Sequence, residues 1–206
     1  NLSITSQIYL DNSTTLTSQT NSGTTVTFSG SIANGGGGSV GAVAISGAGK
    51  TIFTTANNFT GGVTLSGGTL GISAGNQLGA LPGVASTQLT FAGSSTLQFL
   101  ASGGQVNPLR QFLINSGVTG TIDTQTFNNE IAGVISGSGA LAVTGSGTGT
   151  FSLSGVNTYT GGTTVSGGTL KMLGAGALGN TSGSLAVNSG TLDLNGTTQA
   201  VGNFSG

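Results

Sequence analysis

The stretch that decides the fold is "NTYTGGTTVSGGTLKMLGAGALG", residues 157–179. A hundred residues earlier the chain reads "NNFTGGVTLSGGTLGISAGNQLG", residues 57–79, and 12 of the 23 aligned positions are identical without a gap. Both copies join short apolar segments through pairs of glycines. This pattern favours short strands separated by tight turns, because glycine reaches positive φ without steric cost. The chain therefore contains a long internal repeat built from strands and turns.

The composition excludes several classes of function. The 206 residues include 41 glycines, no Cys and no His, and the net charge is −1. Such a chain has no field that would attract nucleic acid, and it lacks the side chains of thiolate and His-based catalysis. We predict no enzyme, no catalytic residue, no cofactor and no metal site. The hydrophobic share of 35% is too high for a disordered Gly/Ser linker.

No apolar run approaches 18 residues, so the sequence predicts no transmembrane helix. The chain begins at Asn1 and shows no charged start followed by an apolar stretch, so we expect no signal peptide within it. We interpret the chain as a processed mature protein or as part of a longer one.

Alternating side chains mark the strands. The segments "GGTLGI", "SSTLQF", "GGTLKM" and "SGTLDL" each place two apolar residues on one side and a Gly, Gln, Lys or Asp on the other. This alternation is typical of a half-buried strand. The inward residues that we expect in the core are Leu70, Ile72, Leu97, Phe99, Leu170, Met172, Leu192 and Leu194.

The spacing of the strands predicts a solenoid. Strands start near Leu70, Leu97, Ile122, Leu141, Leu170 and Leu192, at intervals of 27, 25, 19, 29 and 22 residues. A period of about 20 to 30 residues with short strands indicates stacked coils. We expect an all-β parallel β-helix of roughly 8–10 coils, formed as one unit by residues 1–206, with long repeats at approximately 28–120 and 131–206.

The corners of such coils need glycine. Each copy of the long block carries two Gly-Gly pairs, and turns with positive φ favour glycine over every other residue. The predicted structural turn glycines are Gly61, Gly62, Gly67, Gly68, Gly161, Gly162, Gly167 and Gly168.

The segments "LSGVNTYTGGTTVSGGTLKMLGAGALG" and "LAVNSGTLDLNGTTQAVGNFSG" resemble the autotransporter-associated β-strand repeat, also called the passenger-associated transport repeat. "NNFTGGVTLSGGTL" is a weaker second copy. The resemblance covers about residues 136–206 strongly and about 43–100 weakly. It implies a right-handed β-helix in a large secreted or surface-displayed bacterial protein, with a role in adhesion, aggregation or biofilm formation. The resemblance implies no catalytic residues.

Other motifs carry little weight. "AISGAGKT", residues 44–51, is similar to a phosphate-binding loop, but strand-like sequence follows it where a helix would be required. "GAGALG", residues 174–179, has dinucleotide-loop spacing without a following helix. Asp123 and Glu130 are seven residues apart, and we interpret them as solvated turn residues rather than as a glycosidase pair. Phe59 and Tyr159 stand in turn blocks, where core or exposed positions are both open.

Three functional hypotheses follow. The first is an extracellular structural solenoid that serves as a stalk, an adhesive scaffold or a self-assembling fibre subunit. Neither end of the chain reads as a cap, so its end coils would stack on the rest of a longer passenger or on copies of itself. The alternative is an adhesin module that binds glycan or protein on a solenoid face or at loop 101–112, which is otherwise an ordinary loop or an edge cover. The third hypothesis, a β-helix enzyme, would need an acid–base cluster that these few charges hardly permit.

Overall fold

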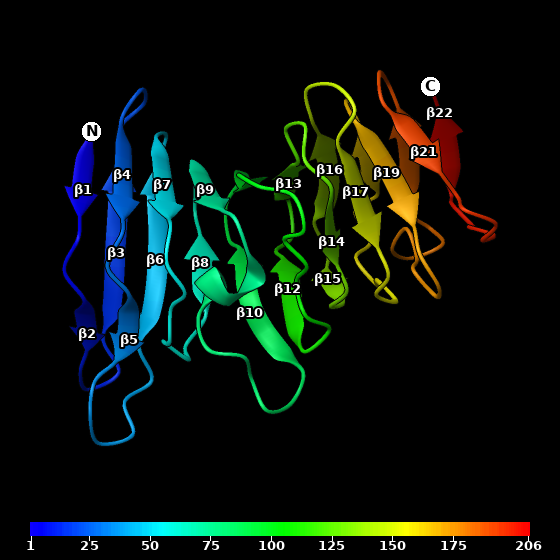
Figure 1. Cartoon of the computed structure of the whole chain (residues 1–206). Helices are drawn as coiled ribbons and strands as arrows, with labels where there is room; N and C mark the ends of the chain where they lie inside the picture. Colours follow the sequence, from blue (N-terminus) through cyan, green and yellow to red (C-terminus); the bar gives the residue numbers. More distant parts are fainter.

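The computed structural model describes all residues, 1–206, as a stack of coils that runs from the N-terminus at one end to the C-terminus at the other (Figure 1). It contains 22 short strands, and every strand pairing is parallel. The structure confirms the predicted all-β parallel solenoid, with about nine turns against the expected 8–10.

Each coil visits three faces in the same order. The first face is one ten-stranded sheet: β1 (Leu2–Ile4), β4 (Thr25–Phe28), β7 (Lys50–Phe53), β9 (Thr69–Ile72), β11 (Ser95–Phe99), β13 (Thr119–Asp123), β16 (Ala140–Thr144), β18 (Thr163–Val165), β20 (Ser184–Val187) and β22 (Asn203–Ser205). The second face holds β2 (Ile8–Leu10), β5 (Ile32–Asn34), β14 (Asn129–Ile131), β17 (Thr150–Leu153), β19 (Thr169–Met172) and β21 (Thr191–Asp193). The third face holds β3 (Thr15–Thr20), β6 (Ala42–Gly47), β8 (Val63–Leu65), β10 (Ser86–Phe91), β12 (Arg110–Ile114) and β15 (Ile135–Gly137).

The second face is the least regular. Its two sheets, β2–β5 and β14–β17–β19–β21, are extended toward each other by single bridges, Ala33 to Asn58 and Val106 to Ile131. Between these bridges the chain forms η1 (Gly75–Leu78), a four-residue 3-10 helix that follows β9 near the middle of the stack (Figure 1). No helix of the structure has the length and the apolar character needed to cross a membrane.

The core fills the interior between the three faces. It is one cluster of 32 buried residues, in which side chains on successive coils lie above one another, as Leu70, Leu97 and Ile122 do on the first face. The rings of Phe28 and Phe53 meet edge to face at 5.8 Å between centroids. Because each fully buried Leu, Ile or Phe contributes about 1.5–3 kcal/mol, these inward columns supply the main stabilisation of a chain with few charges.

The residues expected in the core do not all lie there. Leu192 is partly buried against the core, and Leu194 is 39% exposed, so its assignment to the core was wrong. β21 has a strand neighbour on one side only, and Leu194 follows its last residue, so no next coil of this chain covers that side chain. The other six residues are fully buried: Leu70, Ile72, Leu97, Phe99, Leu170 and Met172.

The two copies of the long block lie on different faces. β8 and β9 of the first copy occupy the third and first faces, whereas β18 and β19, 100 residues later, occupy the first and second. On the third face, β8, β10, β12 and β15 are neighbours, so the chain makes three coils from β8 to β15. It then moves on by one face, from β15 to β16. One more coil leads from β16 to β18. The second copy is therefore advanced by four coils and one face.

This rotation corrects the spacing argument. The intervals from Leu70 to Leu97 and Ile122 are true coil steps on the first face. The interval of 29 residues from Leu141 to Leu170 is not one coil, because Leu141 lies opposite Thr163 on the first face and Leu170 lies on the second. The predicted series counted strand starts from two different faces as if they belonged to one face.

Candidate functional site

Each copy of the block begins with a buried asparagine that is identical in the two copies. Asn57 is buried, and its Oδ1 accepts a hydrogen bond from the backbone N–H of Ile32 at 2.8 Å. Its Nδ2 donates to the carbonyl of Gln77 at 2.7 Å. Ile32 belongs to the preceding coil and Gln77 to the following one. One side chain thus connects three successive coils at a point where the regular ladder is interrupted.

The second copy repeats this arrangement. Asn157 accepts from the N–H of Ile135 at 2.8 Å and donates to the carbonyl of Ala177 at 2.8 Å. Backbone groups that are buried without a partner are costly, and the amide supplies both an acceptor and a donor in one planar group. We call Asn57 and Asn157 the asparagine clasps.

An aromatic ring and a glycine close each block. Phe59 and Tyr159, for which the sequence left an exposed position open, are both fully buried. Gly79 packs directly on Phe59, so that a Cβ at Gly79 would lie 2.5 Å from the Phe59 carbonyl oxygen. Gly179 has the same relation to Tyr159, also at 2.5 Å. The last position of each block requires glycine, because its backbone lies directly against the aromatic residue of the preceding coil.

The two copies differ in a matched pair of positions. The Tyr159 hydroxyl lies 2.6 Å from the Thr163 hydroxyl, and the two are hydrogen-bonded in the core. Burial raises the pKa of Tyr159 well above its usual value, and the hydrogen bond to Thr163 opposes this only in part. In the first copy Phe59 and Val63 stand at these positions and are both buried. A polar pair in one copy is therefore replaced by an apolar pair in the other.

This exchange predicts strong coupling between the two positions. Thr163→Val alone should lower the free energy of unfolding by about 1–3 kcal/mol, because the Tyr159 hydroxyl is left buried without a partner. Adding Tyr159→Phe should recover most of that loss, because the pair then matches Phe59 and Val63. Urea unfolding of the wild type, both single variants and the double variant gives the coupling energy, and additive effects would contradict the prediction.

The two glycines of each pair meet different structural requirements. The second glycine of each pair has positive φ, for example 77° at Gly62 and 88° at Gly162. The first glycine lies against the backbone of the preceding coil: a Cβ at Gly61 would be 2.8 Å from the Gly41 carbonyl oxygen. All eight predicted turn glycines follow this scheme: Gly61, Gly67, Gly161 and Gly167 by close approach, and Gly62, Gly68, Gly162 and Gly168 by positive φ.

The segment that is similar to a phosphate-binding loop forms strands. Residues 44–51 run from β6 into β7, and Lys50 begins β7. Its side chain passes over Gly71 and donates to Gln98 Oε1, and Gln98 in turn donates to Asp123 at 2.8 Å. Gly71 leaves room for this contact because it has no side chain. Lys50 thus joins a polar ladder on the first face.

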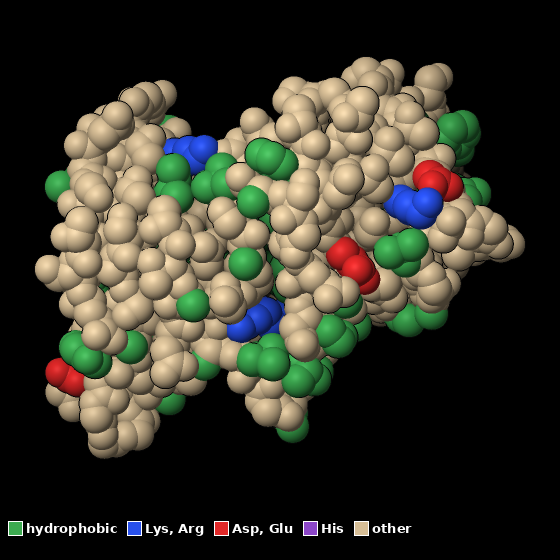
Figure 2. Space-filling model, in the orientation of Figure 1, with side chains coloured by type: hydrophobic (Ala, Val, Ile, Leu, Met, Phe, Trp, Pro, Cys, Tyr) green, Lys and Arg blue, Asp and Glu red, His purple; other side chains and the backbone are tan.

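One ion pair lies on the second face. Lys171 Nζ is 2.9 Å from Asp193 Oδ2, across the pairing of β19 with β21. The hydrogen bond from Lys171, followed by that from the backbone N–H of Asn195, holds the pKa of the Asp193 carboxyl below its usual value. Figure 2 shows that charged side chains are few and scattered over the face that it displays.

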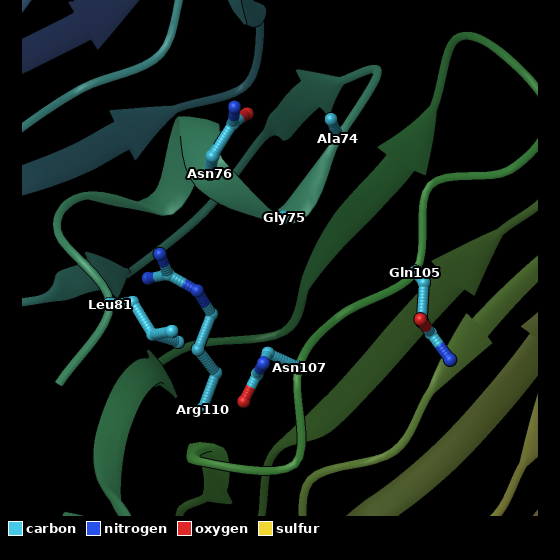
Figure 3. Close-up of a pocket in the computed structure, with 7 residues that line it drawn as sticks. All are labelled: Ala74, Gly75, Asn76, Leu81, Gln105, Asn107 and Arg110. Atoms are coloured by element: carbon cyan, nitrogen blue, oxygen red, sulfur yellow. The ribbon is translucent and has the colours of Figure 1, made fainter. Parts of the chain in front are cut away.

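Loop 101–112 lines a hollow on the side of the molecule. Gln105 and Asn107 line it from this loop, Asn76 from η1 and Leu81 from the segment before β10 (Figure 3). Arg110, the first residue of β12, is only 3% exposed and places its guanidinium between Asn76 and Leu81, with Asn107 beside the base of its side chain. The loop does not simply protrude, since Val106 and Arg110 are buried.

The guanidinium of Arg110 is incompletely paired. Its Nη2 donates to the carbonyl of Gly79 at 2.7 Å, but its Nη1 is buried with no hydrogen-bond partner. Burial lowers the pKa of Arg110 from its usual value. Arginine stays charged in proteins even so. The hollow therefore contains a positive charge that no carboxylate of the chain neutralises.

Sequence reasoning missed the asparagine clasps and the burial of Arg110. The asparagines are identical in both copies, and this identity was an available signal that turn composition obscured. Nothing in the sequence around "NPLRQF" indicates that Arg110 turns inward, because the direction depends on η1 and on the coil that follows.

The profile of the Passenger-associated-transport-repeat family matches residues 46–72 and 143–172, which are the strands and turns of the two rotated copies. The BmaC autotransporter adhesin of Brucella suis biovar 1 (strain 1330) is 38% identical over 132 residues. That alignment covers 62% of this chain and 3% of the relative. No solved structure matches the chain significantly.

These similarities agree with the resemblance seen in the sequence. Two stretches of the chain match the passenger-associated transport repeat, and the similar protein is an autotransporter adhesin. Together they identify an extracellular or bacterial cell-surface protein.

Proposed function

We propose that this chain, which carries two passenger-associated transport repeats, is a length of an adhesive β-solenoid passenger and acts in it as a stalk and scaffold. The observation that carries the proposal is the first face, in which ten strands from β1 to β22 pair without interruption along the whole stack. Such a rod holds whatever it displays at a fixed distance from its attachment. With about nine coils at about 4.8 Å each, its length is about 43 Å.

The end coils support stacking on further coils. β1 pairs only with β4, and β22 pairs only with β20. The N-terminal coil also presents an apolar hollow, lined in part by Leu2, Ile4, Ile8, Leu16, Val26 and Phe28. A parallel strand from another coil would pair with the free edge and cover these side chains. Its natural occupant is a further coil of the same passenger, which continues the core.

A finer form of the proposal is that copies of the chain stack end to end. Head-to-tail contacts that do not close generate open filaments. Negative-stain electron microscopy across a concentration series tests this form. Fibres that lengthen with concentration, and shorten in a Leu2→Lys variant, are the expected result. Isolated rods of about 43 Å at every concentration would overturn self-assembly and leave the stalk intact.

The stalk itself has a separate test. Small-angle X-ray scattering of dilute chain should match the profile calculated for the nine stacked coils, and a clear mismatch would contradict the proposal. We also propose that the long repeats, approximately 28–120 and 131–206, are the units from which the stalk is built. A chain cut after residue 125, between β13 and β14, should then leave each part with strand-rich circular dichroism.

A second candidate function is ligand binding at loop 101–112. The specific observation in its favour is the buried, incompletely paired Arg110 in the hollow that this loop lines. Scaffold and binding module are compatible, because the hollow lies on the side of the rod and not at its ends.

A further inference from the structure

Two buried donors without acceptors belong to residues that line two neighbouring hollows. Arg110, whose Nη1 has no hydrogen-bond partner, lines the hollow beside η1, and Asn129, whose Nδ2 has none, lines a second hollow. Gln105 lines both, so the hollows adjoin. Buried polar groups in proteins are nearly always hydrogen-bonded. An acceptor-rich molecule lying across both hollows would pair both donors.

The first hollow selects a negative charge. Its volume is about 310 Å³, and Arg110 supplies its only charged side chain. A guanidinium binds a carboxylate through parallel N–H donors, and such charge-assisted hydrogen bonds are roughly twice as strong as neutral ones. The neighbouring amides of Asn76 and Asn107 can hydrogen-bond hydroxyl groups. Leu81 is 51% exposed beside the guanidinium, so a small movement of this side chain opens Nη1 to a ligand.

The second hollow selects hydroxyl groups and rejects a second negative charge. Its volume is about 240 Å³, and no apolar side chain lines it. Glu130 lines it, and its carboxylate accepts from Gln105 Nε2 at 3.0 Å and from the Ser154 hydroxyl, one donor on each oxygen, which leaves the remaining lone pairs for hydroxyl donors. Asn129 Oδ1 accepts from the N–H of Gly104 at 2.9 Å, so that only its Nδ2 remains free.

From these two hollows we infer a binding site for an acidic oligosaccharide, with a uronic acid at Arg110 and a neutral sugar beside it at Glu130. The carboxylate of the first sugar pairs with the guanidinium, and the hydroxyls of the second donate to Glu130 and accept from Asn129. A chain in which every sugar is charged is disfavoured, because its next carboxylate would face Glu130.

A peptide ligand fits this site less well. Extended peptides bind by adding a strand to a free sheet edge. At β14, the edge strand at the second hollow, the carbonyls of Asn128 and Glu130 already accept hydrogen bonds from the N–H groups of Gly103 and Val106. The hollows also offer few apolar contacts for side chains, since Ala74 and Leu81 are the only hydrophobic residues among those that line them. The lining is instead rich in amides, which suit hydroxyl groups.

The inference gives a ligand class to the second candidate function and rests on it. It does not depend on the stalk, because rod shape is measured separately. A variant that loses the sugar but keeps the scattering profile of the stacked coils separates failure of the binding site from failure of the scaffold.

Isothermal titration calorimetry with the full chain tests the site. The probe is β-1,4-linked glucuronosyl-glucose, and cellobiose is its matched neutral control, because the two differ only in that a carboxylate replaces one hydroxymethyl group. We expect the acidic disaccharide to bind at least 10-fold more tightly. Arg110→Gln should abolish this preference, whereas Lys50→Gln on the first face should leave it unchanged. Equal affinity for the two sugars, or unchanged binding by Arg110→Gln, would overturn the inference.

A gain-of-binding variant covers the case in which Arg110→Gln does not fold. Glu130→Gln removes the negative charge of the second hollow, so digalacturonic acid should bind at least 10-fold more tightly to this variant than to the wild type. No gain would refute the assignment of the second hollow. Binding of N-acetyl-aspartate amide or of inorganic phosphate as tight as that of glucuronosyl-glucose would also overturn the sugar, since either would show a general anion site.

Discussion

Replacing Asn57 by alanine is expected to lower the free energy of unfolding by about 2–5 kcal/mol. The change removes two buried hydrogen bonds and leaves the N–H of Ile32 and the carbonyl of Gln77 without partners. Each orphaned buried group costs about 1–3 kcal/mol. Chemical denaturation followed by circular dichroism measures the total loss.

The neighbouring residue supplies the control for this prediction. Asn58 is exposed, so Asn58→Ala should change stability by less than about 0.5 kcal/mol. Hydrogen exchange adds a local readout, because the Ile32 amide proton is the one that Asn57 accepts. It should exchange much faster in Asn57→Ala and at the normal rate in Asn58→Ala. Unchanged protection of Ile32 would show that the clasp is not needed at this point of the stack.

Gly79→Ala is the second change with a large expected effect, about 3–5 kcal/mol of destabilisation. Gly79 has φ of 101°, and an added Cβ would lie 2.5 Å from the carbonyl oxygen of Phe59 and 2.9 Å from its ring. Both backbone strain and overpacking therefore act at this position. The midpoint of urea unfolding gives the measurement.

Gly103→Ala separates the two causes. Gly103 also has positive φ, 78°, but an added Cβ there would meet nothing within 4 Å. It should cost only the conformational strain of about 1–2 kcal/mol. The difference between the two variants is the cost of pushing neighbouring coils apart. Equal losses at Gly79 and Gly103 would mean that coil packing tolerates the extra methyl group.

The sequence predicted the fold class because its signals are local. Alternation in "SSTLQF" indicated that Leu97 and Phe99 face inward, and the structure has both side chains buried. Glycine pairs indicated corners, and the positive φ of Gly62 and Gly68 has the same local origin. Such features depend on a few neighbouring residues, which is why period and composition suffice to predict them.

The sequence did not predict features that depend on contacts with neighbouring coils. Leu194 fits the inward pattern of its strand and yet is exposed, because inward orientation buries a side chain only when neighbouring coils cover it. The burial of Arg110 depends on η1 and on the Gly79 carbonyl, 31 positions away. The adjoining hollows are likewise products of stacking across several coils, and no spacing within one segment could predict them.

The rotation between the two copies has a geometric consequence. Advancing one face in three corresponds to a turn of about 120° around the axis. A third copy at the same spacing would therefore occupy the remaining face. A fourth copy would face the same way as the first, about 13 coils or about 62 Å farther along the stack. The glycine pairs of the two copies therefore lie on different sides of the axis instead of in one line, and three such copies would leave a longer rod with no single glycine-rich side.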